Sequence, residues 1–253
     1  YKIISTLIIG VIASLSFNSC QEQPQKYYKV NSPNENLSLN FYLQEGKPIY
    51  QISYDGEEVI TPSALGIDSL DGFSLNHNLK VANVSQKSYD STWVPLYGKR
   101  SVIENQYNEI KFDLNQKGTS RKLNITFRVY NDGVAFRYQL SEIPNDNQFT
   151  LIKEGTGFNF PGNHEAYVFR RKPKGFYGRP SGGQNSSYEG DFRPDSLKNI
   201  KAGEIVALPL LVNTGSNWVA ITEADLTNYS GMYLTPASDG GNHFESLLHP
   251  AYK

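Results

Sequence analysis

The chain has 253 residues and a mass of 28.4 kDa, which suits one large domain or two small ones. Its content of 38% hydrophobic and 19% charged residues excludes a coiled coil and a wholly disordered chain. Lysine and arginine number 24 against 25 acidic residues, so the chain has no basic surplus and nucleic acid is not an expected partner. The single cysteine, Cys20, excludes both a disulfide framework and a cysteine-based zinc site.

The first residues have the pattern of an export signal. Residues 3–17 form an apolar run with the length of a signal-peptide core, too short to cross a bilayer comfortably. Cys20 follows in SFNSC, which is similar to the lipid-attachment sequence of bacterial lipoproteins, although Phe17 stands where leucine is usual. We predict a lipoprotein signal peptide over residues 1–19, lipidation at Cys20, a polar tether over residues 20–26 and export to the periplasm or outer membrane. The alternative is an ordinary signal peptide with an incidental cysteine.

Residues after the tether alternate between apolar and polar side chains, a period of two that predicts strands with one buried face. The clearest hairpin runs from Leu123 to Leu140, because the Asp132-Gly133 pair between its strands suits the positive φ of a tight turn. A second hairpin is expected between residues 206 and 222. The alternation predicts strands over residues 37–44, 49–54, 109–114, 123–129, 134–140, 206–212 and 217–222.

No segment after the apolar run shows sustained helical periodicity, and only residues 222–229 suit a helical turn. Many short strands with turn residues between them indicate a sandwich or barrel, and the length favours a large antiparallel β-sandwich. Residues 155–199 interrupt the pattern and are rich in glycine, proline, asparagine and aromatic residues. We expect a long surface loop there, and long loops in compact domains tend to be functional or disordered.

Three carboxylates are candidates for chemistry: the neighbours Glu223 and Asp225, and Glu189. Glu223 and Asp225 form the closest pair and would share one side of a strand, whereas a glycosidase needs two carboxylates about 5 to 10 Å apart. We prefer the interpretation that both hydrogen-bond to backbone at a strand end. Glu189 lies in the long loop between aromatic and glycine residues, where a carboxylate can bind calcium. One carboxylate supplies few of the roughly six to eight oxygens that calcium takes, so a solvated loop glutamate is the alternative.

The two tryptophans, Trp93 and Trp218, have two interpretations. Exposed aromatic rings can stack on sugar faces, and most carbohydrate-binding modules rely on such rings. A tryptophan in a sandwich more often belongs to the core, and we predict that both are buried.

Several strings resemble the N-terminal domain of glycoside hydrolase family 97. They follow one another in family order and together cover nearly everything after the tether. The strings are SPNENLSLNFYL at 32–43, SALGIDSLDGFSL at 63–75, FRVYNDGVAFRY at 127–138, KEGTGF at 153–158, ALPLLV at 207–212 and TEADLTNYSGMYL at 222–234.

The resemblance implies a fold and an activity. The fold is an all-β, galactose-mutarotase-like super-sandwich over residues 27–253, followed in family members by a (β/α)₈ barrel that carries the catalytic carboxylates. The activity is that of an exported, calcium-dependent α-glycosidase acting on α-linked glucosides or galactosides. In family members a calcium ion sits at the active site, and the N-terminal domain contributes one glutamate to it. Glu189 best matches that contributor by position.

The chain stops at Lys253, before the last strands of the family's sandwich and before the barrel. We therefore expect no catalytic residue within it and no activity from the chain alone. Its expected partners are the barrel, an α-linked oligosaccharide and, through the lipid anchor, a membrane. A free-standing carbohydrate-binding lipoprotein without hydrolytic activity is the alternative.

Overall fold

The computed structural model of the protein describes residues 25–69, 72–141, 150–171, 192–227, 229–238 and 240–248. The predicted signal peptide, Cys20 and Glu189 lie outside these ranges. Regular structure within them is all strand apart from one 3-10 turn, η1 (Leu197–Asn199). No helix in the described part of the chain is thus long and apolar enough to span a membrane. The all-β prediction is confirmed.

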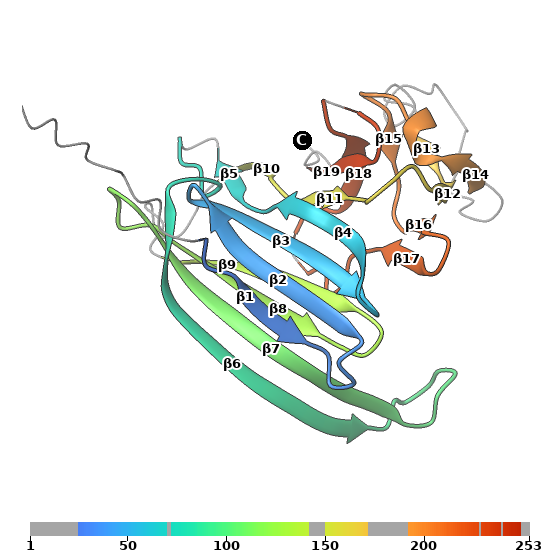
Figure 1. Cartoon of the computed structure of the whole chain (residues 1–253), viewed down its shortest axis with the longest axis horizontal. Coiled ribbons are helices and arrows are strands. Elements are labelled where there is room, and N and C mark those ends of the chain that lie inside the picture. Colours follow the sequence, from blue (N-terminus) through green and yellow to red (C-terminus); the bar gives the residue numbers. More distant parts are fainter. Residues whose placement is uncertain are drawn as a thin grey trace, which may run out of the picture.

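One layer of the sandwich is a four-stranded antiparallel sheet whose strands follow one another in chain order (Figure 1). Alternation along the strands turns Ile110, Phe112 and Leu114 inward, where their side chains are fully buried. The strands are β6 (Leu79–Trp93), β7 (Ile103–Gln116), β8 (Lys122–Val129) and β9 (Val134–Ser141).

The predicted hairpin between Leu123 and Leu140 is confirmed, because these two residues face each other in the pairing of β8 with β9. The tight turn with positive φ that we predicted between its strands is not found. Neither Asp132 nor Gly133 has a positive φ. The strands are joined instead by a four-residue loop in which the Tyr130 N–H donates to the Gly133 carbonyl at 2.8 Å.

The opposite layer belongs to a nine-stranded sheet whose first four strands cover the sheet of β6 to β9 (Figure 1). Two-residue turns connect β2 to β3 and β3 to β4, with positive φ at both central residues of each, Glu45-Gly46 and Asp55-Gly56. Such turns match the twist of paired strands. In spatial order the strands are β1 (Tyr28–Asn31), β2 (Leu37–Gln44), β3 (Lys47–Tyr54), β4 (Glu57–Ala64), β11 (Gly157–Asn159), β19 (His243–Leu248), β18 (Met232–Pro236), β15 (Ile205–Val206) and β13 (Arg170–Arg171).

Aromatic side chains fill the space between these two layers. The rings of Phe41 and Phe112 lie 4.1 Å apart between centroids, and Phe127 packs against both. Tyr50 extends the group toward Phe136. Large rings bury much apolar area per residue, so this row contributes a large share of the force that holds the sheets together.

Two smaller sheets complete the fold. One pairs β5 (Ile67–Ser69) with β10 (Leu151–Glu154). The other buries Ala166 and Val212 on its inner face, in the same continuous core as the main sandwich. Its strands, in spatial order, are β14 (Arg193–Ser196), β12 (Glu165–Val168), β16 (Leu210–Asn213) and β17 (Trp218–Ile221).

The strand predicted over residues 206–212 is divided in two. A cis peptide bond joins Leu208 to Pro209. Proline lacks the N–H that would continue the ladder, so β15 and β16 separate there and enter different sheets. The second part of the predicted hairpin is present, since β16 pairs with β17 from Leu210 to Asn213.

The prediction that both tryptophans are buried is wrong. The side chain of Trp93 is 51% exposed and that of Trp218 is 55% exposed. β7 pairs with β8 only from Asn108 onward, so the part of the β6–β7 hairpin that carries Trp93 projects beyond the sandwich (Figure 1). Trp218 begins β17 on the outward face of the small sheet.

Candidate functional site

Segments far apart in the sequence meet beside the pair of β5 and β10. The backbone N–H of Gly66 donates to the Tyr138 hydroxyl at 3.2 Å, and the hydroxyl oxygens of Tyr138 and Thr156 are 2.9 Å apart. The Thr156 hydroxyl donates to Oε1 of Glu154 at 2.6 Å. These four residues come from three of the strings that carry the family resemblance.

These contacts form a hydrogen-bond chain with one direction. A threonine hydroxyl has one proton, and Thr156 gives it to Glu154. Tyr138 must therefore donate to Thr156 while it accepts from the Gly66 N–H. Burial raises the pKa of Tyr138 well above its ordinary value, so this hydroxyl keeps the proton that it donates.

A tyrosine and a second carboxylate join Glu154 from the segment before β18. The Tyr229 hydroxyl donates to Oε2 of Glu154 at 2.9 Å, and burial followed by the charge of Glu154 raises the pKa of Tyr229. Burial also raises the pKa of Glu223; a hydrogen bond from the Met232 N–H offsets part of the rise, and the charge of Glu154 adds to it. We call these side chains the Glu154 cluster: Tyr138, Glu154, Thr156, Glu223 and Tyr229.

Glu223 and Asp225, the candidate carboxylate pair, do not lie on a strand. β17 ends at Ile221, which pairs with Leu210, the first residue of β16. Glu223 and Asp225 therefore lie beyond the end of the strand. Asp225 is exposed with a φ of 54°, and the described residues between 222 and 229 form no helical turn. The preferred interpretation, a carboxylate that hydrogen-bonds to backbone, holds for Glu223.

Two contacts tie the cluster to the sandwich. The hydroxyl of Tyr50, buried in the core, donates to the Gly157 carbonyl at 2.8 Å. The Gly155 N–H donates to the Gly66 carbonyl at 2.7 Å. A Cβ at Gly66 would lie 2.7 Å from the Cα of Asn76, so only glycine permits the chain at residue 66 to pass this close to Asn76.

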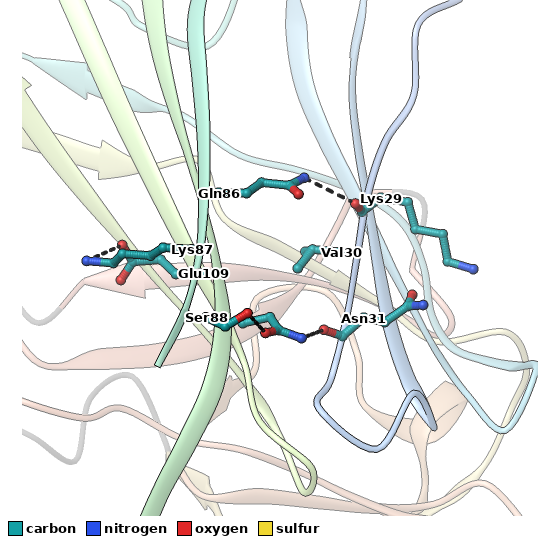
Figure 2. A pocket seen from close by; sticks show the side chains of 8 residues that line it. Lys29, Val30, Asn31, Gln86, Lys87, Ser88 and Glu109 are labelled. Atoms are coloured by element: carbon teal, nitrogen blue, oxygen red, sulfur yellow. Dashed lines mark hydrogen bonds and ion pairs between the residues drawn. The ribbon is translucent and has the colours of Figure 1, made fainter. Parts of the chain in front are cut away.

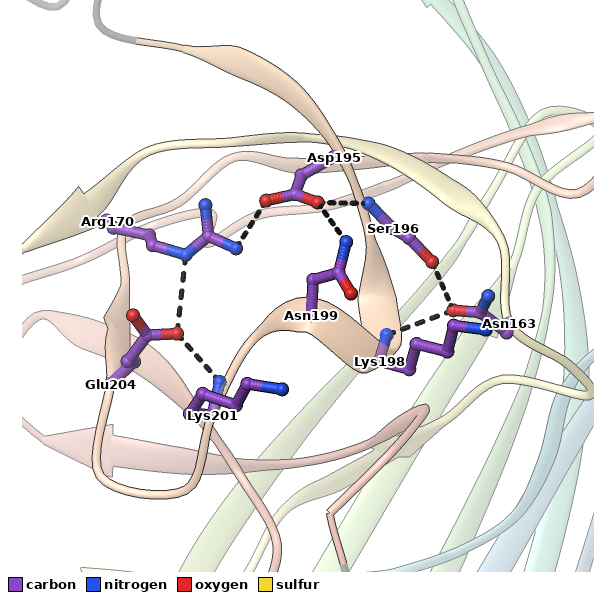
Figure 3. Close-up of polar contacts among 8 residues, drawn as sticks. All are labelled: Asn163, Arg170, Asp195, Ser196, Lys198, Asn199, Lys201 and Glu204. Atoms are coloured by element: carbon purple, nitrogen blue, oxygen red, sulfur yellow. Dashed lines mark hydrogen bonds and ion pairs between the residues drawn. The ribbon is translucent and has the colours of Figure 1, made fainter.

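A second polar network joins β13, β14 and the loop before β15 (Figure 3). The guanidinium of Arg170 donates to Asp195 at 2.6 Å and to Glu204 at 3.3 Å. Hydrogen bonds from Asn199 and Arg170 hold the pKa of Asp195 below its ordinary value. β13 and β14 are the strands on either side of residues 172–191. The network therefore joins the two strands on either side of residues 172–191, which lie outside the described ranges. The prediction of one long surface loop over residues 155–199 is wrong, because β11, β12, β13, β14 and η1 lie within that range and its apolar residues alternate into the core.

A shallow polar pocket of about 420 Å³ opens between β1 and the β6–β7 hairpin (Figure 2). The Asn108 amide donates to the Asn31 carbonyl at 2.8 Å, and the Ser88 hydroxyl donates to Asn108 at 2.6 Å. Glu109 forms ion pairs with Lys87 and Arg128 at 3.1 and 2.8 Å. The hydrogen bond from Asn108 to Asn31 joins the two sheets, and the ion pairs of Glu109 join strands within one of them, so we assign the pocket a structural role.

The described residues do not provide a calcium site. No group of three or more histidine, cysteine, aspartate or glutamate side chains among them is arranged to hold a metal ion. The predicted calcium ligand, Glu189, and the predicted lipidation site, Cys20, both lie outside the described ranges. Both remain predictions.

Residues 30–249 match the protein family described as Glycosyl-hydrolase 97 N-terminal. The chain belongs to this family. The match covers the described residues almost from end to end and confirms the resemblance seen in the sequence strings. The Glu154 cluster is thus a feature of a family 97 N-terminal domain, built from strings that identify the family.

Two curated relatives of this family 97 domain are named as galactosidases. The retaining alpha-galactosidase of Bacteroides thetaiotaomicron is 29% identical over 250 residues, which are 98% of this chain and 35% of that protein. A probable retaining alpha-galactosidase of Streptomyces bingchenggensis is 25% identical over 235 residues, covering 91% of this chain and 33% of that protein. The chain therefore spans about a third of the length of these relatives.

Solved structures share the fold, among them structures of a family 97 enzyme. The enzyme from Pseudoalteromonas sp. strain K8 in complex with acarbose has a TM-score of 0.75 and 25% identity, covering 88% of this chain and 32% of that one. A crystal structure of a beta-arabinopyranosidase has a TM-score of 0.76 and 27% identity, covering 88% of this chain and 36% of that one. The predicted β-sandwich of family 97 is confirmed.

Sequence reasoning did not bring together Glu154, Tyr138 and Tyr229. The KEGTGF string offered a signal, since a glutamate beside two closely spaced glycines marks a place where backbones approach. The string does not predict which residues Glu154 contacts. Tyr138 lies 16 residues before it (154 − 138), and Tyr229 lies 75 residues after it (229 − 154).

Replacing Thr156 by valine tests the hydrogen-bond chain. Valine keeps the shape of the side chain but leaves the Tyr138 hydroxyl without its acceptor and Glu154 without one donor. We expect the free energy of unfolding to fall by about 1–3 kcal/mol, measured by urea denaturation. Thr126→Val, on the outward face of β8, is the matched control and should change stability little. Equal effects of the two substitutions would contradict the directed chain.

The raised pKa of Glu223 predicts a pH-dependent effect on stability. A carboxyl with a raised pKa in the folded state destabilises the fold once ionised, so the penalty is absent in acid and present near neutral pH. We expect Glu223→Gln to raise the melting temperature at about pH 7.5 and to leave it nearly unchanged at about pH 3.5. Glu58→Gln, exposed on β4, is the control. A gain of the same size at both pH values would refute this account.

Proposed function

We propose that the chain is the N-terminal domain of an exported, retaining α-glycosidase that acts on α-galactosides. The observation that carries the proposal is the 29% identity, over 98% of the chain, with a retaining alpha-galactosidase. Because the chain spans about a third of that relative, hydrolysis would be a property of the whole native gene product. Retention requires two carboxyl groups about 5–5.5 Å apart, which the family resemblance places in a barrel outside this chain.

The Glu154 cluster supports a positioning role for this domain. Each oxygen of Glu154 already accepts a hydroxyl proton, and Tyr138 and Thr156 are both engaged. These hydrogen bonds hold the Glu154 carboxylate in one orientation. The cluster joins β9, β10 and the segment before β18 into one unit, on which a catalytic barrel would pack.

A second candidate function is hydrolysis of α-glucosides. The family 97 enzyme from Pseudoalteromonas sp. strain K8 was solved in complex with acarbose and, as its E480Q variant, with panose. The stronger support is for galactosides, because both curated relatives carry that activity in their names.

The apolar run at residues 3–17 followed by Cys20 supports export and a lipid anchor. A glycosidase anchored at the outer membrane or in the periplasm would meet oligosaccharides as they enter the cell. In this proposal the membrane is a partner only through the lipid on Cys20.

The activity is tested on the native gene product that contains this chain. We expect hydrolysis of p-nitrophenyl α-D-galactopyranoside faster than of the α-glucopyranoside, and NMR should show the α-anomer as the first sugar released. A β-anomer as first product would contradict retention. A native product near 28.4 kDa less the signal, with sugar binding and no hydrolysis, would favour the free-standing carbohydrate-binding lipoprotein.

We also propose that Glu189 supplies one ligand to a calcium ion at the active site, the remaining oxygens coming from elsewhere in the native product. In that product, Glu189→Gln should weaken calcium binding measured by calorimetry and lower hydrolysis. The melting temperature in excess calcium should stay nearly unchanged. Asp132→Asn, on the exposed β8–β9 loop, is the control. Calcium affinity and activity both at the wild-type level would show that Glu189 is not a ligand.

A further inference from the structure

The outward face of the sheet β14-β12-β16-β17 presents two neighbouring aromatic rings to solvent. The side chain of Tyr167 on β12 is 39% exposed and that of Trp218 on β17 is 55% exposed. Their ring centroids lie 6.1 Å apart, with the ring planes at 42° to each other. The opposite face of the same sheet is sealed, since Ala166 and Val212 are fully buried.

Strand pairing places polar residues beside these rings. Glu165 pairs with Asn213, and Asn213 pairs with Trp218, so the three form one row across the sheet. Tyr167 begins the next row on the same face, opposite Leu211. The face therefore combines two tilted rings with a carboxylate and a carboxamide at one end. We call it the Tyr167–Trp218 platform.

The platform is held rigidly at the Trp218 end. In the turn before β17, the Thr214 N–H donates to the Asn217 carbonyl at 2.8 Å, and the Asn217 N–H donates back to the Thr214 hydroxyl at 3.2 Å. The Ser216 hydroxyl donates to Glu57 on β4 at 2.5 Å, which ties the turn to the main sheet. A surface that is ordered before binding loses less entropy when a ligand settles on it.

We propose that the Tyr167–Trp218 platform binds hexopyranose units of an α-glycan. The apolar face of a pyranose ring packs on an aromatic ring, and its hydroxyl groups need acceptors and donors at the ring edge. The Glu165 carboxylate supplies acceptors, and the Asn213 amide supplies N–H donors, since its oxygen already accepts from the Gly215 N–H at 2.9 Å. An apolar protein surface fits less well, because it would strip water from Glu165 without a replacement. The inference takes only its choice of sugar from the proposed function.

The test uses the native gene product and affinity electrophoresis in gels that contain amylopectin or galactomannan. We expect at least one polysaccharide to retard the wild-type protein, and Trp218→Ala to weaken this binding roughly tenfold. Tyr167→Ala should act in the same direction. Trp218→Phe, which keeps a ring, should retain most of the binding.

Trp93→Ala is the matched control, because Trp93 is similarly exposed but lies on the projecting β6–β7 hairpin. Polysaccharide binding of this variant should equal that of the wild type. Three results would overturn the proposal. They are no retardation of the wild type, unchanged retardation of Trp218→Ala, and a loss of polysaccharide binding by Trp218→Ala that is accompanied by a fall in the melting temperature of that variant.

Hydrolysis of p-nitrophenyl α-D-galactopyranoside is measured on the same samples to separate the two proposals. Polysaccharide binding through the platform without hydrolysis would uphold the platform and refute the proposed function. Hydrolysis with no platform-dependent binding would do the reverse.

Discussion

The buried hydroxyl of Tyr50 links the hydrophobic core of this domain to its polar cluster. The Tyr50 ring packs with Phe127 and Phe136 between the two layers of the sandwich. A phenol at that depth must find an acceptor, because burying a hydroxyl without one is costly. The acceptor is the carbonyl of Gly157 at 2.8 Å, which holds the KEGTGF segment against the core. Glu154 and Thr156 are thereby placed next to Tyr138, so packing of the sandwich sets the geometry of the cluster.

The two polar networks act on different parts of the domain. The Glu154 cluster joins β9 and β10 to the segment before β18; its Thr156 is buried, whereas its Tyr229 is 46% exposed. The Arg170 network is partly buried and joins the two strands that flank residues 172–191. Exposed ion pairs contribute little to stability, but a guanidinium shared by two carboxylates fixes orientation well. The first network therefore holds three segments that are distant in the sequence together, and the second orients β13 and β14.

The two tryptophans show how position within a sheet decides the role of a side chain. Both lie in strands, and both are exposed because no neighbouring layer covers them. Trp93 extends past the last strand that could shield it, whereas Trp218 stands over a sheet whose other face is buried. Among the described residues, Trp218 has an aromatic neighbour in ring contact, Tyr167, and polar residues in its own row. A domain that belongs to a glycosidase family thus presents a surface suited to sugar outside its polar cluster.

The sequence by itself determined the strand faces, the sandwich class and the family. Alternation with a period of two is local, so Phe41 and Phe112 could be assigned to the core before their partners were known. The family strings are likewise local and needed no fold. Only the tertiary structure decided that Glu154 lies beside Tyr138 and Tyr229 and that Glu223 and Asp225 do not pair. Only the tertiary structure showed that both tryptophans are exposed to solvent. These outcomes depend on which distant strands come to lie side by side, and the spacing of residues along one segment carries no information about that.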